Sequence, residues 1–171
     1  PSTRYFYRVG GPVDGWSRIF SFTSQADRTT LEASLPQVHV LYGDMGAAFA
    51  YSLCPGCGSA ERCDCDDDSR GVVSESPDMI LHMGDFAYNM DTNNGTTADA
   101  FFRNIEPVAA RFPYMICHGN HEDSDVALAR FTESWRHMPS NRAHPTVRTV
   151  NGEAPNNWFF SWDEGLVHYV S

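Results

Sequence analysis

The sequence predicts an α/β fold, a layered β-sheet sandwich flanked by helices. Apolar runs at about 37–43, 78–83 and 113–118 have the length and composition of buried strands. Residues 96–112, between the second and third runs, show helical spacing of apolar side chains. Strands that alternate with helices are typical of α/β layered domains, in which ligands bind beyond the carboxyl ends of the strands.

Two short strands with a glycine-rich turn between them precede this pattern. We expect strands at residues 4–9 and 16–22, which form a hairpin from the end of an upstream β-sandwich domain. The polar stretch 23–34 is expected to be a linker. The predicted division is therefore residues 1–35 for the hairpin and linker, and residues 36–171 for part of a second domain.

Two helices are expected between and after the central strands. In 96–112 the apolar side chains fall on one face, although Pro107 inside this run is expected to kink or split the helix. These side chains are Phe101, Ile105, Val108, Ala109 and Phe112. A second, weaker stripe consists of Leu128, Phe131 and Trp135.

The last part of the sequence predicts another hairpin, with strands at 158–162 and 166–170. The sequence starts within one strand-like pattern and stops within another. We therefore expect the chain to be the middle of a longer protein, with each of its two domains present only in part.

Composition and charge exclude several classes of function. The chain of 171 residues has a formal net charge of −10, which argues against nucleic acid as a partner because phosphate backbones require a basic face. All 12 basic residues are arginines, which excludes chemistry that depends on lysine. No apolar run reaches the length of about 18 residues that a membrane span needs.

A cysteine-rich insert at about 54–70 follows the first central strand. Its cysteines could form two disulfides, coordinate zinc or remain free thiols. Asn94 begins a sequon for N-glycosylation. The cysteines and the sequon together favour an exported protein, and the disulfide candidates are Cys54, Cys57, Cys63 and Cys65.

Polar side chains follow each of the three central strands beside a glycine. Asp44, Asp85 and Asn120 come at these strand ends, and Tyr88 follows Asp85 by three residues. Carboxylate, phenolate and amide oxygens are hard ligands that suit Fe(III), Mn(II) or Mg(II). Asp85, on the middle segment, is the candidate to bridge two metals that hold a phosphate ester. Taken singly, each segment would more often be an ordinary turn.

His121 directly follows the candidate ligand Asn120. An imidazole at this position could bind a phosphate oxygen or protonate a leaving group, so His121 is the candidate catalytic residue.

Three blocks of these residues resemble the purple acid phosphatases, a family of calcineurin-like metallophosphoesterases. They are Asp44-Met45-Gly46, Gly84-Asp85-Phe86-Ala87-Tyr88 and Gly119-Asn120-His121-Glu122. Most members of the superfamily have a histidine where this chain has Gly46, whereas purple acid phosphatases lack it and carry a tyrosine at the position of Tyr88. The N-terminal hairpin also resembles the end of that family's fibronectin-III-like domain.

The resemblance implies a dinuclear centre of Fe(III) and a divalent Fe, Zn or Mn ion. Asp44 and Tyr88 would bind the ferric ion, Asp85 would bridge, and Asn120 would bind the divalent ion. His121 would lie beside the substrate phosphate, and a metal-bound hydroxide would be the nucleophile. The implied localisation is secreted, extracellular or endolysosomal.

The chain ends before the two histidine blocks that complete the family's ligand set. None of His137, His144 and His168 lies in such a block, so none is assigned as a ligand. We expect the parent protein to be an acid phosphatase that acts on phosphate monoesters, and the fragment alone to be inactive. The alternatives are a metallophosphodiesterase of the same superfamily and a non-catalytic extracellular binding module.

Overall fold

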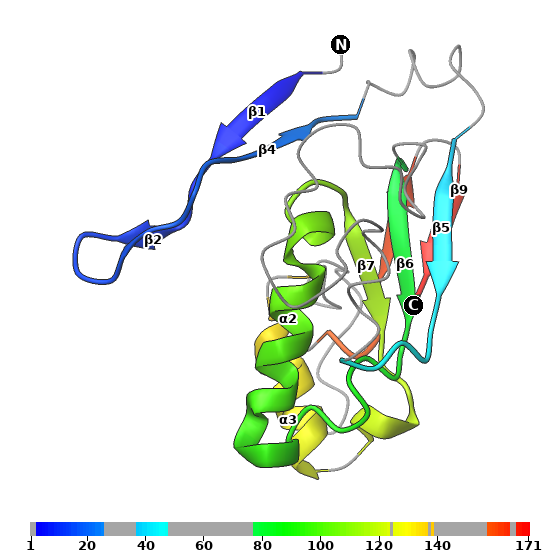
Figure 1. The fold of residues 1–171 in the computed structure, drawn as a ribbon. Helices are drawn as coiled ribbons and strands as arrows, with labels where there is room; N and C mark the ends of the chain where they lie inside the picture. Colours follow the sequence, from blue (N-terminus) through cyan, green and yellow to red (C-terminus); the bar gives the residue numbers. More distant parts are fainter. Residues whose placement is uncertain are drawn as a thin grey trace, which may run out of the picture.

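A parallel sheet of three strands forms the centre of the protein (Figure 1). The computed structural model describes residues 3–25, 37–47, 77–123, 125–136, 138, 157–164 and 167–171. Strands β5 (His39–Tyr42), β6 (Met79–Met83) and β7 (Tyr114–Cys117) lie in the order β5-β6-β7. All three predicted central strands are confirmed, and each is slightly shorter than the apolar run that predicted it.

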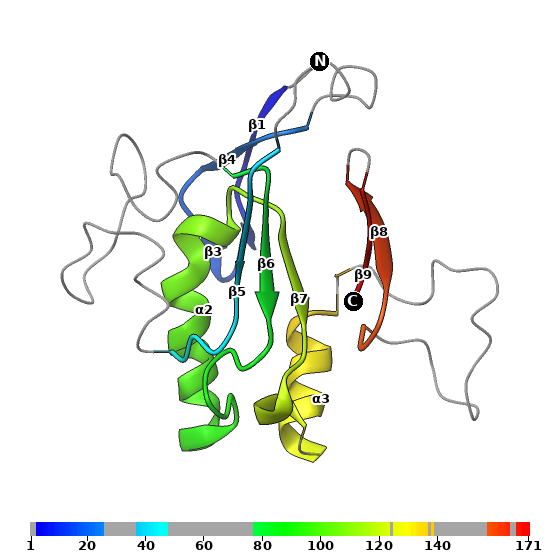
Figure 2. The same cartoon turned by 90° about the vertical axis from the view of Figure 1, so that its right-hand side faces the viewer.

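The sheet is the middle of three layers (Figure 2). Helices α2 (Thr96–Ala109) and α3 (Asp125–Ser134) cover one face, and the hairpin of β8 (Ser161–Glu164) and β9 (Val167–Val170) covers the other. Successive side chains of a strand point to opposite faces. Ile80 therefore packs towards the helices, whereas its neighbour Met79 packs with Phe160 at the start of the hairpin. This arrangement confirms the layered α/β fold.

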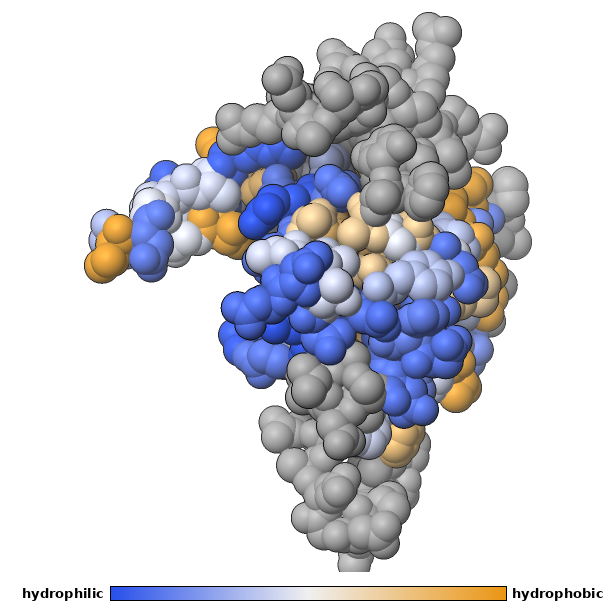
Figure 3. Space-filling view, turned by 60° about the horizontal axis from the view of Figure 1, so that its bottom comes forward, coloured by the Kyte–Doolittle hydropathy of each residue, from blue (hydrophilic) through white to orange (hydrophobic). Residues whose placement is uncertain are grey.

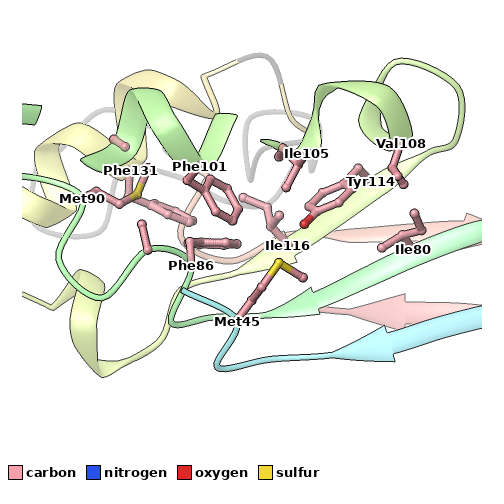
Figure 4. Packing of buried hydrophobic residues seen from close by; sticks show 12 residues of the cluster. Met45, Ile80, Phe86, Met90, Phe101, Ile105, Val108, Tyr114, Ile116 and Phe131 are labelled. Carbon is pink, nitrogen blue, oxygen red and sulfur yellow. The ribbon is translucent and has the colours of Figure 1, made fainter. Parts of the chain in front are cut away.

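Aromatic and aliphatic side chains together fill the core between the sheet and the helices (Figure 4). Phe86, Phe101 and Phe131 come from a strand-end loop and from both helices, and each is completely buried. Burial of one such side chain contributes about 1.5–3 kcal/mol. The core therefore fixes the loop after β6, which carries Asp85, to the helical layer.

Helix α2 ends at Ala109, three residues before the predicted end, and it continues through Pro107. A proline ring removes one backbone donor and crowds the preceding turn. Here the proline lies in the last turn, so only the bond to the carbonyl of Arg103 is lost and the helix is not split. Phe112 lies in the turn that follows, where its N–H donates to the carbonyl of Val108.

The N-terminal hairpin is a separate arm (Figure 1). Its long pair consists of β1 (Arg4–Tyr7) and β4 (Phe20–Thr23), and a short pair, β2 (Gly10–Gly11) and β3 (Gly15–Trp16), closes its tip. The predicted strand 16–22 is thus interrupted. The reason lies at Ser17, whose hydroxyl accepts a bond from the N–H of Val9 at 3.0 Å and replaces a backbone rung of the ladder.

The arm contacts the rest of the described protein through a few polar groups. Tyr7 Oη donates to the carbonyl of Ala110 at 2.8 Å, and Arg18 pairs with Glu106 at 3.6 Å. The origin of this arm in an upstream fibronectin-III-like domain, and the domain boundaries at 35 and 36, stay predictions.

Several expectations concern residues outside the described ranges: most of the linker 23–34, the insert 54–70 with its four cysteines, and Gly165 in the expected turn 163–165. The predicted strand at 158–162 is shifted, because β8 spans Ser161–Glu164 and includes two residues expected in that turn. Cys117, at the end of β7, is half-buried and unpaired. Two 3-10 helices, η2 (Thr92–Gly95) and η3 (Asn120–Glu122), complete the described elements. In these ranges no helix has both the length and the apolar character of a membrane span.

Candidate metal centre

The candidate ligands lie at one end of the central sheet because its three strands are parallel. Asp44 follows β5, Asp85 follows β6, and Asn120 begins η3 shortly after β7. Asp44 and Asp85 both have a φ of 55°, in the left-handed region that residues other than glycine adopt rarely. Such strain tends to gather at functional sites, where it aims a side chain.

Asp44 and Tyr88 meet directly. Tyr88 Oη donates to Asp44 Oδ1 at 2.8 Å. This bond to a carboxylate, with smaller contributions from desolvation and the charges of Asp85 and Glu122, raises the pKa of Tyr88 to about 12. The proton therefore stays on the phenol and is directed at the carboxylate. Both are hard donors at the spacing of neighbouring ligands, so a ferric ion fits this pair and would take the place of the proton.

Gly46 leaves the space that the Tyr88 ring uses. A Cβ atom at position 46 would lie 3.3 Å from Cδ2 of that ring, and the backbone there has a φ of +70°. A larger side chain at 46 and the tyrosine at 88 would therefore compete for the same volume. This gives a physical reason for the pairing of a glycine at 46 with a tyrosine at 88.

Asp85 is fixed between two loops. Its Oδ1 accepts a bond from the backbone N–H of His121 at 3.1 Å. A Cβ atom on Gly119 would lie only 2.2 Å from the same oxygen, so glycine is required there. The carboxylate is 7% exposed and lies between the end of β6 and the end of β7. This position suits the bridging role expected of it.

His121 is held by its ring as well as by its backbone. Nδ1 lies 3.0 Å from Oδ1 of Asn89, and the ring packs edge-on against Tyr88 with 4.5 Å between centroids. Asn120 itself is exposed at the start of η3, one residue before His121. The structure therefore joins Asp44 to Tyr88 and Asp85 to His121, with Asn120 adjacent in the chain.

Glu122 is a buried carboxylate that the sequence analysis quoted but gave no role. It is completely buried and accepts three backbone N–H bonds, from Asp85 at 2.8 Å, Phe86 at 3.1 Å and Gly119 at 2.9 Å. It therefore clamps the loop after β6 to the loop after β7. Its place three residues after Gly119 is capping-box spacing, a signal that could have identified it.

A second buried network lies beneath the strand ends. His82 Nδ1 is 2.8 Å from Tyr114 Oη, which accepts a bond from Tyr42 Oη at 2.7 Å. Burial lowers the pKa of His82 to about 4. The folded protein thus keeps His82 neutral, and its protonation costs stability as the pH falls from about 6.5 towards 4. A histidine within an otherwise apolar strand was the signal for this network.

Within the described ranges, no three side chains drawn from His, Cys, Asp and Glu gather as a metal-binding group. The candidate ligands do not form such a group, because two of the four are a phenol and an amide. Figure 3 shows a largely hydrophilic surface at the centre of the molecule, with hydrophobic side chains on the arm and at the opposite edge. An open pocket of ≈ 490 Å³ lies elsewhere, where Tyr7 and Phe22 of the arm face Phe112 and Glu164.

Comparison with known proteins identifies the family. The model of the calcineurin-like phosphoesterase family matches residues 41–168. Acid phosphatase type 7 of Mus musculus is 36% identical over the whole chain, and that of Homo sapiens is 34% identical; the chain spans 32% of each. An Arabidopsis thaliana protein named "Probable inactive purple acid phosphatase 9" is 29% identical over 98% of the chain and 28% of that protein.

A solved structure supports the same fold. Purple acid phosphatase PPD1 from yellow lupin (Lupinus luteus) seeds aligns with 98% of this chain and 29% of its own, with a TM-score of 0.53 and 22% identity. The chain spans about a third of the length of the curated relatives it matches. It belongs to the calcineurin-like phosphoesterase family, where its relatives include proteins named acid phosphatase and purple acid phosphatase.

Proposed function

We propose that the parent protein of this chain hydrolyses phosphate monoesters at a dinuclear centre of Fe(III) and a divalent Fe, Zn or Mn ion. The observation that carries the proposal is the contact between Asp44 and Tyr88 at 2.8 Å, in space that Gly46 leaves open. A phenol and a carboxylate in hydrogen-bond contact at a strand end offer two hard oxygen ligands for a ferric ion. The names of the relatives support the same activity.

The proposed roles follow the contacts. Asp44 and Tyr88 would hold the ferric ion, Asp85 would be shared by the two ions, and Asn120 would hold the divalent ion. When bound, the ions supply the Lewis acidity that polarises the ester and acidifies an attacking water. His121 faces the substrate and supplies the proton that the leaving group needs.

The remaining ligands are proposed to come from segments beyond residue 171, so the chain alone is expected to be inactive. Asn94 is exposed on η2, where it is accessible to a glycosyl transferase. We propose a glycosylated, secreted or endolysosomal protein, with disulfides among the four cysteines of the insert. Phosphate monoesters are its proposed substrates.

The test is a matched pair of phenol removals in the parent protein. Tyr88→Phe should abolish the visible absorption of an iron–tyrosinate centre, whereas Tyr5→Phe, on the exposed arm, should leave it unchanged. The wild type should hydrolyse p-nitrophenyl phosphate faster than bis(p-nitrophenyl) phosphate. Preference for the diester would favour a phosphodiesterase, and a colourless wild type without turnover would favour a binding module.

A further inference from the structure

Asn89 faces the ring of the candidate catalytic histidine. Its Oδ1 lies 3.0 Å from Nδ1 of His121. A carboxamide oxygen can only accept, so with Oδ1 facing the ring this contact is a hydrogen bond only in the tautomer that carries a proton on Nδ1. When the ring is neutral, Nε2 is then the nitrogen without a proton.

The backbone is bent to make this contact. Tyr88 and Asn89 have φ values of 48° and 80°, so two consecutive residues are left-handed. Each such residue other than glycine costs about 1–2 kcal/mol, although asparagine tolerates the conformation better than most. This bend sends the Tyr88 hydroxyl to Asp44 and the Asn89 carboxamide to His121.

Two further contacts locate His121 but do not choose its tautomer. Its backbone N–H donates to Asp85, and its ring packs edge-on against Tyr88. Neither contact distinguishes Nδ1 from Nε2. Among these neighbours, only Asn89 bonds to a ring nitrogen.

We propose that Asn89 is a positioning residue, which holds His121 in the Nδ1–H tautomer and turns Nε2 towards the leaving group. This inference rests on the proposed function. In the step concerned, water forms the new bond to phosphorus and gives a proton to solvent, and the bond to the leaving oxygen breaks. That oxygen takes the proton from Nε2, and the ring keeps its second proton on Nδ1.

The kinetic test in the parent protein uses Asn89→Gly, because glycine accepts a φ of 80° and removes only the carboxamide. We expect kcat on glycerol phosphate, an alkyl ester that needs protonation, to fall about 10-fold or more, because general acid catalysis contributes about 10²–10⁴-fold. On p-nitrophenyl phosphate, whose leaving group departs as a stable anion, the fall should be below about 3-fold. KM should change little for either ester.

The matched control is Asn93→Gly. Asn93 also has a left-handed backbone, with a φ of 54°, and is exposed on η2. It should leave both kcat values unchanged. Equal losses on the two esters in Asn89→Gly, or the same losses in Asn93→Gly, would overturn the proposal.

A double-mutant cycle tests whether Asn89 acts through His121. In a His121→Ala background, Asn89→Gly should have no further effect on glycerol phosphate. A full, multiplicative second loss would show that Asn89 acts independently and would overturn the proposal.

Nitrogen NMR of the metal-free parent protein, labelled with ¹⁵N-histidine, gives a readout separate from catalysis. The neutral His121 ring should be in the Nδ1–H form in the wild type and should shift towards Nε2–H in Asn89→Gly. An Nε2–H ring in the wild type would overturn the inference. The expected tautomer in a protein that hydrolyses neither ester would refute the proposed function but support the contact with Asn89.

Discussion

Removal of the buried charge at Glu122 should allow the loops after β6 and β7 to open locally while the rest of the protein stays folded. The carboxylate accepts three backbone bonds, two through Oε2 and one through Oε1 from Phe86. In Glu122→Gln the amide oxygen can keep two of them, while its NH₂ group faces the N–H of Phe86. The loss of one bond to a charged acceptor costs about 2–3 kcal/mol, whereas Glu122→Ala leaves three buried donors unpaired and costs at least ~4 kcal/mol.

Hydrogen exchange measures this cost where it arises. The amides of Asp85, Phe86 and Gly119 should exchange about 30- to 150-fold faster in Glu122→Gln, since 1.4 kcal/mol corresponds to a factor of ten. The control is Glu133→Gln, which removes an exposed carboxylate paired with an arginine one helical turn away and should cost less than about 0.5 kcal/mol. If Glu122→Gln leaves these three amides as protected as in the wild type, the clamp does not hold the loops.

Three more outcomes are expected. Gly46→Ala should weaken the visible absorption of the iron-loaded parent protein, because its Cβ crowds the tyrosine ring. The control Gly15→Ala adds similar backbone strain, at a φ of +83° with open space around it, and should leave the spectrum unchanged. Equal spectra for the two variants would contradict this. Burial and the charge of Asp78 raise the pKa of Glu164 to about 7, so between about pH 4.5 and 7 the folded state retains a proton that the unfolded state releases, and stability falls as the pH rises. Glu164→Gln should abolish this fall, which thermal unfolding at a series of pH values measures. A profile that is unchanged in both Glu164→Gln and its control Asp14→Asn would be the contrary result. Phe101→Ala should lower the free energy of unfolding in urea by about 3–5 kcal/mol, and a loss below about 1 kcal/mol would show that this ring is not part of a close-packed core.

The sequence could predict the elements whose formation depends on local pattern. Residues 79–83 and 114–117 form strands where almost all side chains are apolar, and α2 starts where the helical spacing starts. The break in the strand at 16–22 could not be predicted, because Ser17 bonds to Val9 across the hairpin. The period of the apolar residues carries no information on such a contact.

The candidate site likewise contains residues that a local sequence pattern predicted and residues that it missed. Asp44, Asp85 and Asn120 were found because each follows a strand, and parallel strands end together. The role of Asn89 was missed because its bond reaches a partner 32 residues away in the sequence. Glu122 has one local bond, to Gly119, but its bonds to Asp85 and Phe86 span 37 and 36 residues. Whether Asp44, Asp85, Tyr88 and Asn120 bind metal stays a prediction.

The most direct test of this account is the anomalous scattering of iron in crystals of the iron-loaded parent protein. We predict one strong peak about 2.2 Å from oxygens of Asp44, Tyr88 and Asp85, and a second metal peak shared between Asp85 and Asn120. Iron bound away from these side chains, or the bond between Tyr88 and Asp44 intact beside a distant metal, would contradict the central claim.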